Sequence, residues 1–204
     1  MNKTLPTLWL VTLFFMGCAT QKNIEQSPIN NVYPKEQRIK QLKELQQWQI
    51  NGKLGFIQKK KRQSATLFWQ YDQASQAQTL KLNTYLGINV LALHSKNNFH
   101  TVTVDGQTYQ SDDLDHLIYS LTELTLPTRA MHSWLKGLAF LPSDRISYHE
   151  DSKLPTALVS HYNGQEWHIT YSDYQQVNAH QLAKKITLKQ NDLTIKIMIN
   201  QWTL

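Results

Sequence analysis

Residues 49–71, QINGKLGFIQKKKRQSATLFWQY, carry the clearest structural pattern in this 204-residue chain. Apolar or small residues occupy every second position of the first half: Ile50, Gly52, Leu54 and Phe56. The second half repeats this spacing at Ala65, Leu67, Trp69 and Tyr71. A period of two is typical of a strand with one buried face. The charged run 59–62 between the halves predicts a turn, so the stretch is expected to form a β-hairpin.

Segments of the same kind follow at intervals of about ten residues. Strands are expected at 78–85, 87–95, 98–105 and 107–110, and again at 145–150, 156–162, 166–172, 182–190 and 193–203. Turn signals separate them, of which Asp105-Gly106 and Asn163-Gly164 are typical of two-residue hairpin loops. The spacing predicts a meandering antiparallel sheet of about ten or eleven strands.

Three segments have helical spacing instead. Residues 35–48 carry an apolar stripe, residues 112–124 begin with three aspartates that suit a helix N-terminus, and residues 127–139 begin at Pro127. A long antiparallel sheet with so few helices is expected to form an incomplete β-barrel with the helices as a lid. The pattern leaves open whether its apolar interior is filled by its own side chains or holds an apolar ligand.

The N-terminus predicts export and lipidation. Lys3 is followed by an apolar run from Leu8 to Met16 and then by Gly17-Cys18, which is the layout of a bacterial lipoprotein signal. The run is too short to span a bilayer as a helix. We expect a signal peptide at 1–17, a lipid-modified Cys18 with a flexible tether at 18–34, and one domain at 35–204. An ordinary signal peptide or an uncleaved anchor is the alternative.

Composition limits the function classes. The formal net charge of +6 is spread along the chain, which favours anionic lipid or an acidic protein over nucleic acid as a partner. Cys18 is the single cysteine, so no internal disulfide is possible. The chain has no G-x-S-x-G elbow and no P-loop. The acids at 112–115 fit a helix start better than a metal site. We expect no enzyme activity and no cofactor apart from the lipid on Cys18.

Seven segments stand out by their order and spacing along the chain: 48–55, 64–69, Leu86-Gly87, Leu126-Pro127, 134–138, 163–167 and 195–202. Together they resemble the LolB family of outer-membrane lipoprotein receptors. The resemblance implies a half-barrel with a helical lid around an apolar cavity. It also implies a monomeric receptor in the outer membrane, facing the periplasm. Such a receptor accepts acylated lipoproteins from the carrier LolA and inserts them among the phospholipids of the inner leaflet.

The alternative function is a lipid-binding or scaffold lipoprotein anchored in the same membrane, which stores a small apolar ligand. A periplasmic hydrolase is a more remote third. The receptor needs both a cavity and an apolar loop, whereas the storage protein needs only the cavity.

Candidate site residues follow from the pattern and the resemblance. Tyr85, Leu86 and Gly87 lie where the family carries a protruding apolar residue linked to membrane delivery, so they are the expected insertion loop. The expected cavity lining is Leu54, Phe56, Leu67, Trp69, Leu80, Leu82, Val90 and Ala92 on strands, with Leu117, Leu121, Trp134, Leu135 and Leu138 on the lid. Lys59 to Arg62 form a charged turn that could contact a partner or simply be solvated.

Overall fold

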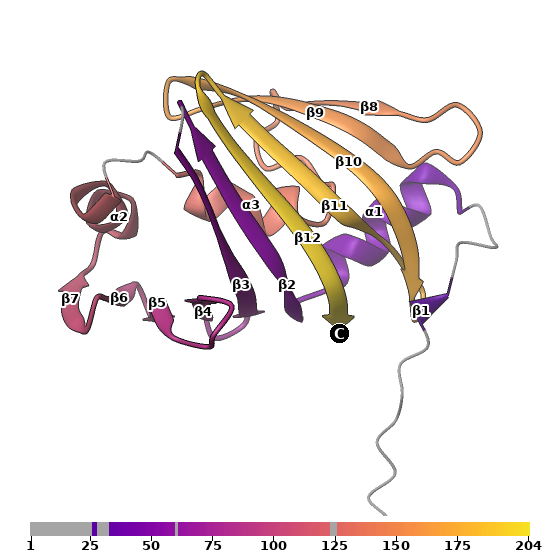
Figure 1. The fold of residues 1–204 in the computed structure, drawn as a ribbon. Coiled ribbons are helices and arrows are strands. Elements are labelled where there is room, and N and C mark those ends of the chain that lie inside the picture. The colour runs from indigo at the N-terminus through magenta and orange to yellow at the C-terminus, as the bar shows by residue number, and fades with distance from the viewer. Residues whose placement is uncertain (1–25, 28–32, 60, 123–125) are drawn as a thin grey trace, which may run out of the picture.

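The computed structural model describes residues 26–27, 33–59, 61–122 and 126–204 (Figure 1). Its helices are α1 (Lys35–Glu44), α2 (Leu114–Thr122) and α3 (Thr128–Trp134). Its strands are β1 (Gln26–Ser27), β2 (Gln47–Gln58), β3 (Lys61–Asp72), β4 (Ala77–Asn83), β5 (Asn89–Lys96), β6 (Phe99–Val104), β7 (Gln107–Ser111), β8 (Arg145–Tyr148), β9 (Pro155–Tyr162), β10 (Gln165–Val177), β11 (His180–Gln190) and β12 (Leu193–Thr203).

The sheet is antiparallel and open. Its eleven main strands follow the order β7-β6-β5-β4-β3-β2-β12-β11-β10-β9-β8. Strands of this path that are consecutive in the chain pair with each other, except for β7 and β8, which are its two edges; the C-terminal β12 also pairs with β2 and so joins the two halves. This confirms the expected incomplete barrel with three helices. All three helices are shorter than predicted: α1 ends at Glu44 so that Trp48 lies on β2, α2 begins at Leu114, and α3 ends at Trp134.

The β2–β3 hairpin forms in the expected register, with Ile50 opposite Trp69 and Gly52 opposite Leu67. On its other side β2 pairs with β12, whose register shifts between Ile199 and Gln201. Gly52 lies beside this irregularity, and a Cβ atom there would come within 2.1 Å of the Met198 carbonyl oxygen. A side chain at this position would therefore push the two strands apart.

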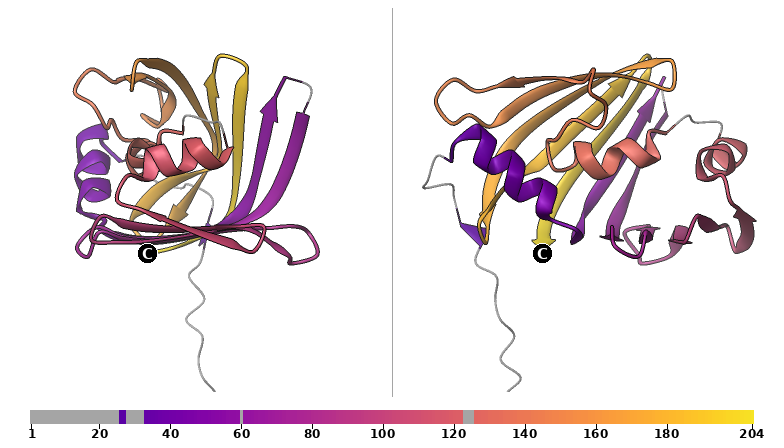
Figure 2. Two further views of the ribbon diagram at one scale, coloured as in Figure 1. Left: turned by 90° about the vertical axis from the view of Figure 1, so that its left-hand side faces the viewer. Right: turned by 180° about the vertical axis from the view of Figure 1, so that it is seen from behind.

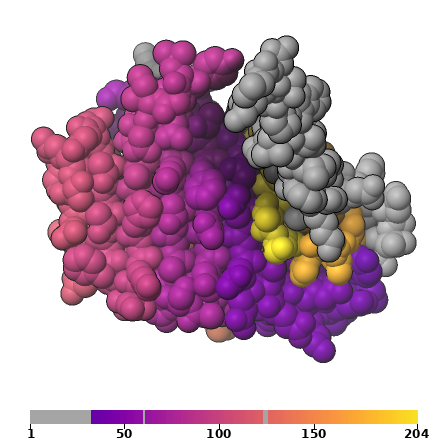
Figure 3. All heavy atoms as spheres, turned by 90° about the horizontal axis from the view of Figure 1, so that it is seen from below, coloured from indigo at the N-terminus to yellow at the C-terminus, as the bar shows by residue number. Residues whose placement is uncertain are grey.

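The sheet bends between β3 and β4, so that β4–β7 form a lower wing and β2, β3 and β9–β12 a rising wall (Figures 1 and 2). The magenta-to-pink surface seen from below belongs to this wing (Figure 3). Helices α1 and α3 lie on the inner side of the wall, and α2 lies above the wing beside β7 (Figure 2). This bend divides the interior into two compartments.

The interior contains two separate clusters of buried apolar side chains. The main cluster joins α1 and α3 to the wall and includes Trp134, whose ring lies 6.0 Å from Tyr162 and 6.1 Å from Trp167. The second cluster lies between α2 and the wing and consists of Leu93, Val102, Leu114, Leu117 and Ile118. The small size of the second cluster indicates that α2 is held more weakly than α1 and α3.

Two buried cations tie α1 to the segment after α3. Lys136 Nζ donates to the carbonyl oxygens of Leu42 at 3.1 Å and Leu45 at 3.3 Å. Arg38 Nη2 donates to the carbonyl oxygens of Lys136 at 2.9 Å and Gln181 at 3.2 Å. The last carbonyls of a helix lack partners within it and favour positive charge, so these contacts fix α1 against the wall.

The expected tether is paired at one point. The backbone of Gln26 and Ser27 forms β1 and pairs with Val177 and Gln176 of β10. Residues 1–25 and 28–32 lie outside the described residues, so the signal peptide and the lipidation of Cys18 stay predictions. Within the described residues, no helix is long and apolar enough to cross a membrane.

Candidate functional site

The inner face of the wing changes from polar to apolar along its strands. Three rows of cross-strand neighbours run over β3–β7, two residues apart along each strand. The polar row is Tyr71, Gln78, Ser95, His100 and Ser111; the middle row is Trp69, Leu80, Leu93, Val102 and Tyr109; the tip row is Leu67, Leu82, Leu91, Val104 and Gln107. The tip row is nearest to the β4–β5 connection. Antiparallel pairing places the members of each row side by side on one face.

Helix α2 covers the middle row. Its Leu114, Leu117 and Ile118 are buried against Leu93 and Val102. Leu121, one turn further along, is only half-buried, as are Leu82, Leu91 and Val104 of the tip row. The tip row is therefore the part of the apolar face that the helix covers least.

A half-open cavity of about 910 Å³ lies at the polar row, between β3–β6 and the first turns of α2 and α3. Tyr71, Gln78, Ser95 and His100 form its floor. Exposed polar residues form its rim: Gln76, Asn98, Asp112, Asp113, His116 and Arg129. The sequence predicted an apolar cavity, whereas this one is lined mainly by polar groups.

His132 of α3 lies between the cavity and the main cluster of buried side chains. Its ring stacks on Tyr71 with centroids 3.9 Å apart and lies 5.4 Å from the Trp69 ring. Burial, with a smaller contribution from the Lys136 charge, lowers the pKa of His132 to about 3. The imidazole is neutral at physiological pH, so it acts as an aromatic packing group with one polar edge.

Gln78 of β4 links the wing to Trp69 and His132. Its Oε1 accepts a hydrogen bond from Trp69 Nε1 at 3.1 Å and lies 3.1 Å from His132 Nε2. An indole N–H can only donate, so the Gln78 carbonyl oxygen must face Trp69. The amide hydrogens of Gln78 then point away from Trp69 and His132.

The β4–β5 connection is a three-residue hairpin loop that exposes apolar side chains. The Gly87 N–H donates to the Thr84 carbonyl at 3.0 Å, and the Thr84 N–H donates to the Ile88 carbonyl at 2.8 Å. Gly87 has a φ of 83°, which completes a type I turn with a glycine bulge. Tyr85 and Leu86 occupy the two central turn positions, where they are 93% and 83% exposed.

Two further apolar residues extend this loop surface. Ile88 is 63% exposed and Val90 is 37% exposed. We call Tyr85, Leu86, Ile88 and Val90 the apolar tip. Ile88 was missing from the sequence-based prediction, although its position directly after Tyr85-Leu86-Gly87 in a polar turn context could have drawn attention to it. The site therefore includes more apolar surface than a single protruding leucine provides.

The predicted lining of Val90 and Ala92 is wrong. Ala92 is paired with Lys81 and Thr103, on the face opposite to Leu91 and Leu93. A continuous apolar run hides which of its two faces is buried. Val90 lies two residues before Ala92 on β5, so it points to the same outer face, and it belongs to the apolar tip.

The other predicted lining residues divide between the two clusters. Leu117 of α2 belongs to the second cluster and Leu121 packs against it, while Leu80 packs against both clusters. The main cluster contains Leu54, Leu67, Trp69, Trp134, Leu135 and Leu138, each at most 6% exposed, and Phe56 and Leu82 pack against it. Contact of any of these residues with acyl chains stays a prediction.

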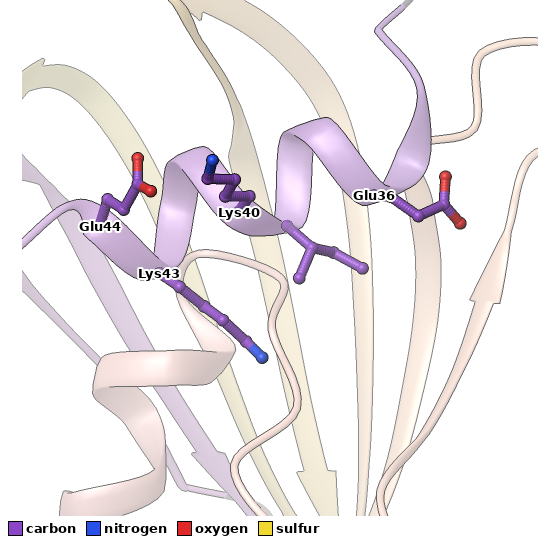
Figure 4. A pocket seen from close by; sticks show the side chains of 5 residues that line it. Glu36, Lys40, Lys43 and Glu44 are labelled. Atoms are coloured by element: carbon purple, nitrogen blue, oxygen red, sulfur yellow. The ribbon is translucent and has the colours of Figure 1, made fainter.

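Charged surface features are found elsewhere. A shallow groove of about 410 Å³ on α1 is lined by Ile39 and by Glu36, Lys40, Lys43 and Glu44, whose charged ends point in different directions (Figure 4). Alternating charges of this kind are typical of a solvated helix face. Lys59, Lys61 and Arg62 are exposed at the β2–β3 turn, and their contact with a partner stays a prediction.

Comparisons with known proteins give consistent results. The family model for the outer membrane lipoprotein LolB matches residues 46–202. The outer-membrane lipoprotein LolB of Vibrio cholerae is 34% identical over 94% of this chain and 92% of its own length. Its counterpart in Pseudoalteromonas translucida is 30% identical over 93% of this chain and 89% of its own length.

The fold is also similar to solved structures. A LolA superfamily protein from Nitrosomonas europaea superposes with a TM-score of 0.56 at 8% identity, covering 84% of this chain and 94% of its own. A putative outer membrane lipoprotein-sorting protein domain from Vibrio parahaemolyticus gives a TM-score of 0.53 at 7% identity, covering 83% of this chain and 90% of its own. At such low identity the likeness concerns the fold.

Proposed function

The chain belongs to the outer membrane lipoprotein LolB family, and we propose that it is a receptor that accepts acylated lipoproteins and inserts them into the outer membrane. In this proposal the cargo comes from the periplasmic carrier LolA and is released among the phospholipids of the inner leaflet. The receptor works as a monomer held to the membrane by lipid on Cys18. It moves cargo between apolar environments without chemical reaction.

The observation that carries this proposal is the apolar tip at the end of an apolar inner face. Tyr85 and Leu86 are almost fully exposed, although both gain free energy by leaving water. The half-buried Leu82 and Leu91 of the tip row lie on β4 and β5, the two strands that this turn connects. A tethered domain with this arrangement can place its tip in the lipid interface while acyl chains leave along the same strands. A storage protein would need no exposed tip, so the tip favours the receptor over the alternative function.

A comparison of two free energies explains how cargo can enter the compartment beneath α2, which the protein's own side chains fill. Lifting α2 exposes Leu114, Leu117 and Ile118, at about 1.5–3 kcal/mol each, or roughly 5–9 kcal/mol together. One long acyl chain gains on the order of 10 kcal/mol when it replaces them, at about 0.8 kcal/mol per methylene. The two quantities are similar, so binding is close to balanced. Near balance allows both acceptance from a carrier and release to a bilayer, where the chains are fully buried.

Transfer from a loaded carrier tests the proposal. The mature chain, made without its lipid by Cys18→Ala, is mixed with carrier that holds a labelled triacylated lipoprotein, and the two proteins are separated. We expect the label to move to this chain without any nucleotide. Retention of all cargo by the carrier would contradict the receptor function. Carrier without cargo, and cargo without its acyl chains, serve as controls.

A further inference from the structure

The polar cavity has no part in the proposed transfer of acyl chains, yet it opens onto the same inner face. The polar row forms its floor, and the middle and tip rows continue from that floor to the apolar tip. From Gln78 to Tyr85 the chain advances seven residues, which is roughly 23 Å at about 3.3 Å per residue. The wing thus has a polar end and an apolar end a fixed distance apart.

From Gln78 in the polar row to Leu82 in the tip row the strand advances four residues, about 13 Å, which is close to the length of an acyl chain. In a bilayer an acyl chain spans about 15 Å, half of a hydrocarbon core of about 30 Å. A chain that begins at the polar row therefore ends close to the tip row. The base of each chain is an ester or amide group, whose carbonyl oxygen needs a hydrogen-bond donor when it leaves water.

The cavity offers such donors. The Gln78 carbonyl oxygen is engaged by Trp69, so its amide hydrogens are free to face the cavity that Gln78 lines. Arg129 on the rim adds a guanidinium group with five N–H donors in a fixed plane. The rim is exposed, so the peptide that follows the cysteine can leave the cavity into solvent.

We propose that this cavity binds the ester and amide carbonyl groups of the cargo's acylated cysteine, so that the acyl chains point toward the apolar tip. This inference rests on the proposed receptor function and adds the orientation of the cargo. In this orientation the chain ends reach the membrane first. The polar linkage stays bound until the chains have entered the bilayer.

The test compares two ligands that differ only in their ester carbonyl groups. One is a triacylated cysteinyl peptide with two ester linkages and an amide linkage, and the other is its ether analogue, in which the two esters are replaced by ethers and the amide is kept, so that both carry the same charge. Affinities for the mature chain with Cys18→Ala are measured by displacement of a fluorescent apolar probe. We expect the ester ligand to bind about tenfold tighter than the ether analogue, as one hydrogen bond to a charged donor implies.

Two variants assign this preference to the cavity. Arg129→Met should remove most of the tenfold preference and leave the affinity for the ether analogue unchanged. Gln78→Glu keeps the acceptor for Trp69 but loses the amide donor, and should reduce the preference about twofold. Arg145→Met on β8, an exposed arginine that does not line the cavity, is the matched control and should change neither affinity.

Equal affinity of the unmutated chain for both ligands would overturn the inference while leaving the receptor function intact. An equal loss for both ligands in Arg129→Met would also overturn it, because the arginine would then act on the fold or on the apolar chains. Failure to bind either ligand would overturn the inference together with the receptor function itself.

Discussion

Replacing Leu86 with glutamate separates acceptance of cargo from its delivery. Leu86 lies at the centre of the β4–β5 turn, and the hydrogen bonds that shape the turn come from the backbone of Thr84, Gly87 and Ile88. The substitution should therefore leave the fold intact, with a change in the free energy of unfolding below about 0.5 kcal/mol. It should also leave uptake of cargo unchanged, because Leu86 is exposed on the turn and is not part of the cluster beneath α2.

The expected loss of delivery follows from exposure. Full burial of a leucine side chain is worth about 1.5–3 kcal/mol. Leu86 is 83% exposed, so its insertion into lipid contributes about 1.2–2.5 kcal/mol. Glutamate removes this contribution and adds the cost of a charge at the interface. Since about 1.4 kcal/mol corresponds to a factor of ten, delivery should fall roughly tenfold or more.

The assay follows labelled cargo from the loaded receptor to liposomes that are recovered by flotation. Phe99→Glu is the matched control, because Phe99 is 52% exposed and begins β6 at the opposite end of the same wing. It should deliver cargo as the unmutated chain does. Normal delivery by Leu86→Glu, or an equal defect in Phe99→Glu, would refute the role of the apolar tip.

Three further predictions concern the fold and the lid. Leu117→Ala should lower the free energy of local unfolding of α2 by about 2–5 kcal/mol, so amide hydrogen exchange should become faster across α2 but not across β11 and β12. An unchanged exchange rate in α2 would contradict the independence of this helix from the main cluster. Gly52→Ala should destabilise the chain by about 1–3 kcal/mol in urea unfolding, because its Cβ would meet the Met198 carbonyl. The lowered pKa of His132 means that the unfolded chain binds a proton more readily, so stability falls as pH drops from about 6.5 toward about 3. Between pH 6.5 and 5 the free energy of unfolding of the unmutated chain should fall by about 2 kcal/mol more than that of His132→Phe. Parallel plots of unfolding free energy against pH for the two proteins would exclude this effect.

Much of the fold could be predicted from local patterns. Period-two alternation in β2 and β3, and the turn pairs Asp105-Gly106 and Asn163-Gly164, depend on neighbours within a few residues. The φ angles of these turn residues are all positive, between 50° and 77°, as a tight hairpin turn of this kind requires. The resemblance also directed attention to Tyr85 and Leu86, which the structure places exposed on the β4–β5 connection; their insertion into a membrane stays a prediction.

The faces of the strands were harder to predict. Val90, Leu91, Ala92 and Leu93 are all apolar, so the pattern does not show which two point inward. Pairing with Lys81 and Thr103 shows that Ala92 points outward. Likewise, Trp134, Leu135 and Leu138 have the spacing of a lid, but packing against the wall places them in the main core.

By itself, the sequence determined the antiparallel half-barrel and its three helices, because these depend on short-range alternation, spacing and turn chemistry, while the exposed turn was expected from the family resemblance. Tertiary structure alone decided the two compartments, the weakly held α2 and the polar cavity at one end of the wing. Tyr71, Gln78, Ser95 and His100 are separated in sequence and meet only through strand register. The bend between β3 and β4 then places α2 and α3 above them, and no local pattern encodes that arrangement.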